Sequence, residues 1–259
     1  SGQAKLVSYG FSENPKAIKL DWQKDVSVTA ETINKIRSEA GITCQNAVSA
    51  LPTFSVFSSV LNLSNVTKKD VASAVHWEAK KVIPLPLEDM ILDWKKIDSK
   101  LEGDKPGNMR VLLTGAPKTL VKKYIDIYRQ SQINLLSLET ETFSLIRSLL
   151  GNDKSTVMVV EIGASTTDVT IVDNSIPMLN RSIDVGGVSI TRAISQKMGM
   201  GDQQAEQFKY DLGINALDSG EGELPPVVTE TIEPIVNEIK YAINLFQSKY
   251  KKSTEKIVL

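Results

Sequence analysis

The feature that most constrains the fold is the segment Val157–Gly187, in which three β-rich runs are joined by short turns. The first run, Val157–Val160, leads into Glu161 and then into the small, hydroxyl-rich turn Gly163–Thr167. A turn of this kind leaves backbone N–H groups free to point at an anion, and a carboxylate at the end of the first strand can face a metal ion. The segment therefore predicts a β-meander that carries a nucleotide phosphate site.

Strands and helices alternate along the chain without internal repeats, which is typical of α/β architecture with mixed sheets. We expect further strands over residues 5–10, 17–20, 46–51, 55–63, 90–96, 109–116, 134–138 and 256–259. We expect helices over residues 29–40, 67–81, 118–131, 141–150, 189–198, 204–212 and 228–250. Thr29 is the expected N-cap of the first helix, and Thr67 and Asp70 have the spacing of a capping box. Three consecutive strands followed by a helix form the core of a ribonuclease-H-like half.

Composition excludes several classes of protein. Thirty basic and 31 acidic residues leave a net charge of -1, which gives no electrostatic case for nucleic-acid binding. Cys44 is the single cysteine, so an internal disulfide is excluded, and we expect it to be a small buried hydrophobe. His76 is the single histidine, which excludes His-clustered metal sites, and we expect it partly exposed on a helix. No apolar run approaches the ~18 residues of a membrane span, and the N-terminus has no signal-peptide pattern.

Several blocks of the chain resemble the PilM family, the actin-like proteins of type IV pilus assembly. The most specific block is Trp77–Asp89, WEAKKVIPLPLED, which is similar to that family's WEAxxxIPxPLEE segment. Val111–Pro117, VLLTGAP, is similar to its VLLVAAPK block. Glu161–Thr167 looks like its DIGASTT turn, and Val185–Gly187 looks like its VGG. The order and spacing of these blocks agree over residues 4–259.

The resemblance implies an α/β, actin-like fold of two ribonuclease-H-like lobes, with a small α/β subdomain inserted in the first lobe. The first lobe would comprise residues 1–54 and 135–155, the inserted subdomain residues 55–134, and the second lobe residues 156–259. Both lobes are expected to be truncated, because the family's first phosphate hairpin, of DxGxxxxK type, and its adenine loop are absent. We therefore expect weak or no ATP binding in this chain, and at most a weak ATPase.

In the full-length protein the resemblance implies ATP and Mg²⁺ as cofactors, bound in a cleft between the lobes. The nucleotide-binding residues would be Gly163, Ala164, Ser165, Thr166, Thr167, Gly186, Gly187 and Glu238. Small residues let the backbone approach a phosphate closely, and the hydroxyls can donate hydrogen bonds. The alternative is that a small-residue hairpin between two strands is only a turn.

Candidate acidic residues accompany the turn. Glu161 takes the place of the family's usual Asp, which orients magnesium through water, and its extra methylene would make it reach the ion differently. Asp168 is the alternative metal ligand. Glu139 or Glu141 would orient an attacking water from the connection between the lobes.

The resemblance also implies a partner, the short cytoplasmic N-terminal peptide of the inner-membrane protein PilN. The groove would lie between the first lobe and the inserted subdomain, where an extended peptide meets apolar or edge-strand contacts. The candidate residues are Val56, Phe57, Val60, Leu61 and Trp77. The alternative is that these are core residues, with Trp77 packing its helix on the sheet.

These implications describe a cytoplasmic scaffold of type IV pilus assembly, or of a related secretion system, held at the inner face of the membrane by partners that include other inner-membrane pilus proteins. Self-association is a further expectation, and neither nucleic acid nor a direct membrane span is expected. A cell-division protein of FtsA type is an alternative, and it would carry a C-terminal amphipathic helix that this chain does not show. An actin-like sugar kinase is a second alternative, and it would lack the block at Trp77–Asp89.

Overall fold

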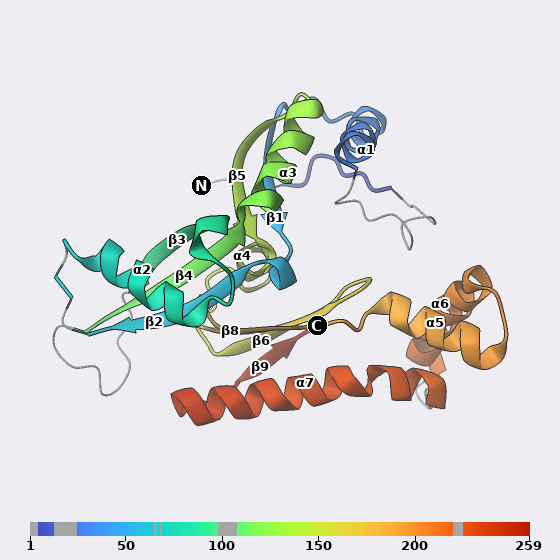
Figure 1. Ribbon diagram of the computed structural model, residues 1–259. Helices are drawn as coiled ribbons and strands as arrows, with labels where there is room; N and C mark the ends of the chain where they lie inside the picture. Colours follow the sequence, from blue (N-terminus) through green and yellow to red (C-terminus); the bar gives the residue numbers. More distant parts are fainter. Residues whose placement is uncertain (1–4, 13–24, 65, 68, 98–107, 220–224) are drawn as a thin grey trace. The chain divides into compact units, whose positions relative to one another are not determined.

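The computed structural model describes residues 5–12, 25–64, 66–67, 69–97, 108–219 and 225–259, and within 214–219 it describes the backbone only (Figure 1). The chain divides into two compact units. The first comprises residues 1–57, 61–96 and 107–141, and the second comprises residues 58–60, 97–106 and 142–259. The expected division into two lobes and an inserted subdomain stays a prediction.

A two-stranded parallel sheet forms one part of the first unit. Strand β1 (Asn46–Leu51) pairs with β5 (Asn134–Thr140). Helix α3 (Lys118–Gln130) packs on this sheet, and α1 (Val26–Glu39) packs on α3 (Figure 1). The core between them is built from Leu51, Ala116, Leu120 and Tyr124.

A three-stranded sheet with one covering helix belongs to the first unit, except for residues 58–60 and 97, which are assigned to the second. Its strands are β2 (Phe57–Leu63), β4 (Met109–Pro117) and β3 (Met90–Ile97), in that order across the sheet. Helix α2 (Val71–Val82) buries residues at four-residue spacing, because such positions share one face of a helix. The core consists of Leu61, Leu63, Val71, Val75, Ala79, Ile83, Met90, Val111 and Leu113.

The second unit is built on the meander that the sequence predicts. Strands β6 (Val157–Ile162), β7 (Thr167–Asp173) and β8 (Ile176–Ile183) pair antiparallel in chain order. Strand β9 (Lys256–Val258) pairs parallel with β6 and completes a four-stranded sheet. The expected meander is therefore confirmed.

Helices precede and follow this sheet in the chain. Helix α4 (Glu141–Leu145) continues into a π-helical turn over Ile146–Leu150, which packs on β6 and β7. Helices α5 (Gly187–Met198) and α6 (Asp202–Ser219) follow the meander, and α7 (Pro226–Tyr250) is the longest helix described (Figure 1). Helix α6 extends past the expected end at residue 212, because its backbone hydrogen bonding continues to residue 219.

Helix α7 contributes to two separate hydrophobic clusters. Ala242 and Phe246, in its C-terminal half, pack on the sheet of β6–β8. Val227 and Val228, at its N-terminal end, pack with α5 and α6 instead. Pro234 lies inside the helix, between the two packed stretches.

Two expected strands near the N-terminus have different outcomes. The strand expected over Lys5–Gly10 is wrong, because this stretch pairs with no strand in the described part of the chain. It lies against α1, where the Ser8 hydroxyl donates to the Ala40 carbonyl oxygen at 2.5 Å. The strand expected over residues 17–20 lies outside the described residues.

Three local expectations are corrected by the structure. Helix α1 is capped by Asp25 rather than Thr29, because the Asp25 carboxylate accepts hydrogen bonds from amides of the first turn. The capping box at α2 is not formed, since the Thr67 hydroxyl donates to the Asp70 side chain at 2.5 Å and Asp70 caps no amide. Cys44 is exposed rather than buried, whereas His76 is exposed on α2 as expected.

Polar contacts hold β9 against the start of β6. The Lys256 ammonium lies 2.7 Å from the Asp153 carboxylate, and the Thr156 N–H donates to Glu255 at 2.9 Å. The hydrogen bonds from Lys256 and Ser155 hold the pKa of Asp153 well below its usual value. The contacts tie the C-terminal strand to the sheet through side chains as well as through the backbone.

This arrangement predicts an acid-sensitive contribution to stability. Because the folded pKa of Asp153 is depressed, its contribution is present above the ordinary pKa of 3.8 and is lost progressively as the pH falls below it. The thermal unfolding midpoint of wild type should therefore be higher than that of Asp153→Asn at pH 6. The difference between the two midpoints should become smaller towards pH 2. A difference that is the same at both pH values would contradict this role for Asp153.

Phe246 gives a test of the second unit's core, because it is only 1% exposed. Phe246→Ala should lower the free energy of unfolding by about 3–5 kcal/mol, as expected for a fully buried aromatic ring. Tyr210→Ala is the matched control, since this ring is 64% exposed on α6. Urea denaturation of both variants measures the difference, and equal losses would contradict the assignment of the core.

Candidate functional site

The turn between β6 and β7 is a tight hairpin. The Gly163 N–H donates to the Thr166 carbonyl oxygen at 2.9 Å, while Ala164 and Ser165 are exposed at the tip. Within the residues that the structure describes, the amides of Ala164 and Ser165 donate no hydrogen bond. Two adjacent, exposed N–H donors are therefore available to an anion, as the sequence predicts.

The start of α5 is bonded to this hairpin through its backbone. The Gly187 N–H donates to the Gly163 carbonyl oxygen at 2.9 Å, and the Val188 N–H donates to the Ala164 carbonyl oxygen at 2.8 Å. The first two amides of α5 are thus used inside the protein and are not available to a ligand. They hold the hairpin against the helix and fix the direction of its tip.

Gly186 permits this close approach. A Cβ atom at Gly186 would lie 2.6 Å from the Gly163 carbonyl oxygen and 2.8 Å from the Ala164 carbonyl carbon, both of which are backbone atoms. At Gly187 the nearest atom would be the Lys209 Nζ at 3.5 Å, an ordinary contact. Of the two glycines predicted near a nucleotide, Gly186 is the one that the backbone geometry requires.

Lys209 places a positive charge beside the first turn of α5. Its Nζ, on α6, donates to the Gly187 carbonyl oxygen at 3.2 Å and to the Thr191 hydroxyl at 2.9 Å, and it lies 2.7 Å from the Glu206 carboxylate. Burial disfavours the ionised form of Glu206, but the hydrogen bonds from Lys209 and Thr191 outweigh it, and the pKa is lowered. Sequence reasoning missed Lys209, because a Glu–Lys pair three residues apart on a helix is usually a solvated surface pair.

Two carboxylates lie on the sheet next to the hairpin. Glu161 on β6 is the direct register partner of Asp168 on β7, and an oxygen of each lies within 4.8 Å of the other. Burial raises the pKa of Asp168, and hydrogen bonds from Ser182 and Thr166 oppose that rise. Like charges opposite each other destabilise a sheet, so a divalent cation with oxygen ligands suits this pair.

The remaining predicted residues of the nucleotide site have contacts of their own. The Glu238 carboxylate on α7 pairs with the Arg181 guanidinium, which lies 4.8 Å from the centre of the Tyr241 ring. In the first unit, a Glu141 carboxylate oxygen accepts from the Thr53 N–H at 2.9 Å. Glu139 is half-buried on β5.

The predicted partner residues differ in exposure. Leu61 is 6% exposed in the core beneath α2, and Phe57 packs against that core. Val56 packs in the cluster under α3, and Val60, which is assigned to the second unit, packs against the core of that unit. These four side chains contribute to cores, as the alternative reading of the sequence describes.

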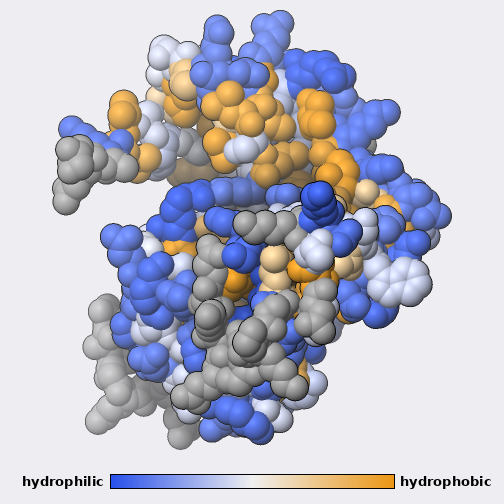
Figure 2. All heavy atoms as spheres, turned by 90° about the vertical axis from the view of Figure 1, so that its left-hand side faces the viewer, coloured by the Kyte–Doolittle hydropathy of each residue, from blue (hydrophilic) through white to orange (hydrophobic). Residues whose placement is uncertain are grey.

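Trp77 is the exception. It is 64% exposed, so the alternative in which it packs its helix on the sheet is wrong. Val75 and Ala79 face the core instead, and a residue two positions from each of them lies on the other side of the helix. Val48 and Leu136 are also exposed apolar residues of the first unit. Figure 2 shows apolar patches between hydrophilic ones on the face that it draws.

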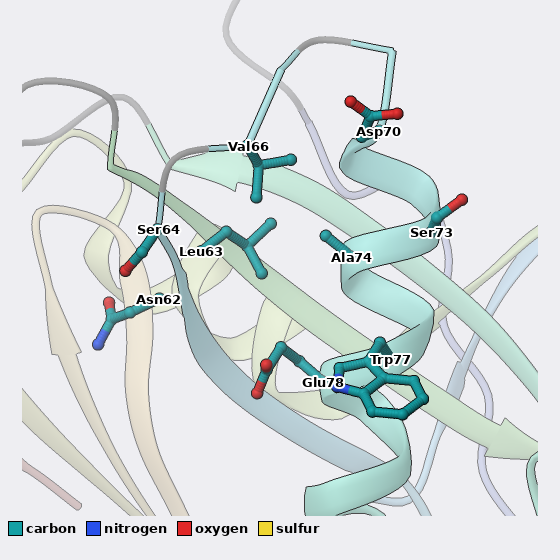
Figure 3. Close-up of a pocket in the computed structure, with 9 residues that line it drawn as sticks. All are labelled: Asn62, Leu63, Ser64, Val66, Asp70, Ser73, Ala74, Trp77 and Glu78. Atoms are coloured by element: carbon teal, nitrogen blue, oxygen red, sulfur yellow. The ribbon is translucent and has the colours of Figure 1, made fainter.

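Trp77 borders a groove of about 510 Å³ between the end of β2 and α2 (Figure 3). Leu63, Val66 and Ala74 supply apolar surface, and Figure 3 shows Leu63 and Ala74 on facing elements. Glu78 extends from α2 on the side of β2. The lining residues are Asn62, Leu63, Ser64, Val66, Asp70, Ser73, Ala74, Trp77 and Glu78.

Comparisons with known proteins cover most of the chain. A family model described as type IV pilus assembly protein PilM matches residues 14–259. A chain of the solved "PilM-PilN type IV pilus biogenesis complex" is similar with a TM-score of 0.71 and 21% identity, over 86% of this chain and 65% of that one. The ethanolamine utilization protein EutJ from Carboxydothermus hydrogenoformans matches with a TM-score of 0.48 and 12% identity, over 91% of this chain and 61% of that one.

The likeness to the PilM chain shows the fold, so the expected actin-like α/β architecture is confirmed. The chain spans about 65% of the length of that PilM chain. In the described part of the chain, no helix is both long and apolar enough to cross a membrane.

The two glycines before and at the start of α5 give a matched test of the hairpin geometry. Gly186→Ala should lower the free energy of unfolding by about 1–3 kcal/mol, because its new methyl group would overlap backbone atoms of the hairpin. Gly187→Ala should stay close to wild type. Urea denaturation measures both, and an equal response of the two variants would contradict the close contact at Gly186.

Proposed function

The chain belongs to the family of the type IV pilus assembly protein PilM, and from this premise we propose that it is a scaffold that binds a short peptide of an inner-membrane partner. The partner proposed is the cytoplasmic N-terminal peptide of PilN, by analogy with the PilM–PilN complex that the fold resembles. Binding to such a peptide would hold the protein at the inner face of the membrane without a span of its own.

The observation that carries this proposal is the exposure of Trp77 beside a groove with apolar lining. A tryptophan that is 64% exposed leaves a large apolar area in water, and tryptophan is enriched among the residues that dominate binding energy. Trp77 also lies in the sequence block that is most specific to the family. The groove offers an adjacent surface for the side chains of a peptide.

A pull-down with the PilN N-terminal peptide tests this site. Trp77→Ala should weaken binding by about 30-fold, the loss expected when a binding hot spot of about 2 kcal/mol is truncated. Trp94→Ala is the matched control, because Trp94 lies on β3 in the same unit and is 37% exposed. Retention of both variants at wild-type level would reject Trp77 as the anchor.

A second function is supported by the hairpin. We propose that the protein binds a nucleotide phosphate there, with the amides of Ala164 and Ser165 as donors and the charge of Lys209 nearby. Glu161 and Asp168 would hold Mg²⁺, directly or through water. The ion would neutralise phosphate charge, while Gly186 keeps the hairpin in the position that the donors require.

Calorimetric titration with ATP and Mg²⁺ tests the hairpin. The titration uses a form of the protein whose length equals that of the similar PilM chain. Gly163→Val should weaken ATP binding at least about tenfold, because a Cβ atom there would lie 3.1 Å from the Thr166 carbonyl oxygen and distort the turn. Gly201→Val is the control, since a Cβ atom at Gly201 has no neighbour within 4 Å. Unchanged affinity in Gly163→Val would remove the hairpin from the nucleotide site.

A further inference from the structure

We propose that Pro234 is a hinge in α7, about which α5, α6 and the first half of α7 move as one body relative to the sheet of β6–β8. The hinge is a property of the second unit itself and does not depend on the ligands proposed above. Its consequence is that the position of the hairpin tip follows the position of this body.

Helix α7 lacks one backbone hydrogen bond at Pro234. Proline has no N–H, so residue 234 cannot donate to the carbonyl oxygen of Glu230, and its ring crowds that carbonyl. A proline inside a helix is a usual cause of local bending, because it interrupts the ladder of hydrogen bonds. The Pro234 side chain is exposed, whereas the next residue, Ile235, is buried.

The two halves of α7 belong to different hydrophobic clusters. Val227, Val228 and Ile232 pack with α5 and α6. Ile239, Ala242, Ile243, Phe246 and Tyr250 pack in the cluster on the sheet. The two clusters share no residue, so Pro234 separates stretches that are held by different neighbours.

The first half of α7 contacts α5 through an ion pair as well as through apolar packing. The Lys197 ammonium lies 3.0 Å from the Glu230 carboxylate, one turn before the proline. Lys209 in turn ties α6 to the first turn of α5. These contacts make α5, α6 and residues 226–233 of α7 one body.

This body reaches the hairpin by two backbone hydrogen bonds. The amides of Gly187 and Val188 donate to the carbonyl oxygens of Gly163 and Ala164. A rotation of the body about Pro234 must therefore either carry the hairpin tip with it or break these two bonds. The exposed amides of the tip would then change direction through a motion that begins about 70 residues away in sequence, at Pro234 in α7.

Distances between spin labels test the hinge in the protein without ligand. One label pair joins Gln203→Cys on α6 to Ser248→Cys in the second half of α7, both exposed, in a Cys44→Ser background. The distance distribution of this pair should narrow when Pro234→Ala restores the missing hydrogen bond. The control pair, Gln203→Cys with Glu233→Cys, lies within the body and should keep the same width.

Amide exchange supplies the second readout. The Gly187 and Val188 amides should exchange about fivefold more slowly in Pro234→Ala, a factor that corresponds to one additional hydrogen bond. Circular dichroism checks that the variant keeps its helices. The hinge is rejected if the first label pair has the same width in both proteins, or if the control pair changes as much as the first pair.

Discussion

The second unit depends on a contact between two stretches of backbone, the hairpin at Gly163–Thr166 and the first turn of α5. The two hydrogen bonds across this contact require the chains to approach so closely that Gly186 has no room for a side chain. The same bonds consume the amides at the start of α5. Free backbone donors are thereby left at the hairpin tip, on Ala164 and Ser165, where the proposed anion would bind.

This division of roles would let one helix position the proposed site without contacting its ligand. Lys209 donates a hydrogen bond to the Gly187 carbonyl oxygen and pairs with the Glu206 carboxylate, so α6 reinforces the first turn of α5. The carboxylates of Glu161 and Asp168 continue the polar surface along the sheet. The groove beside Trp77 is built separately, within the first unit, from β2 and α2.

Local sequence signals predicted the meander, because apolar, β-rich runs and turn chemistry are properties of neighbouring residues. They did not predict the contact of Lys209 with Gly187, which joins residues 22 positions apart on different elements. Lys5–Gly10 has the composition of a strand, but a strand also needs a partner, and composition does not supply one. The exposure of Trp77 could have been predicted, because the phase of α2 is set by Val71, Val75 and Ala79, and Trp77 is out of phase with them. That signal was present in the sequence.

The proposed scaffold role places partner binding on the first unit and leaves the hairpin of the second unit for a nucleotide. The most direct test of the partner surface is photo-crosslinking in cells, with benzoylphenylalanine incorporated at position 77 and, separately, at position 94. We expect an adduct with PilN from position 77 and none from position 94. An adduct from position 94 alone, or none from either position, would contradict the assignment of the groove beside Trp77.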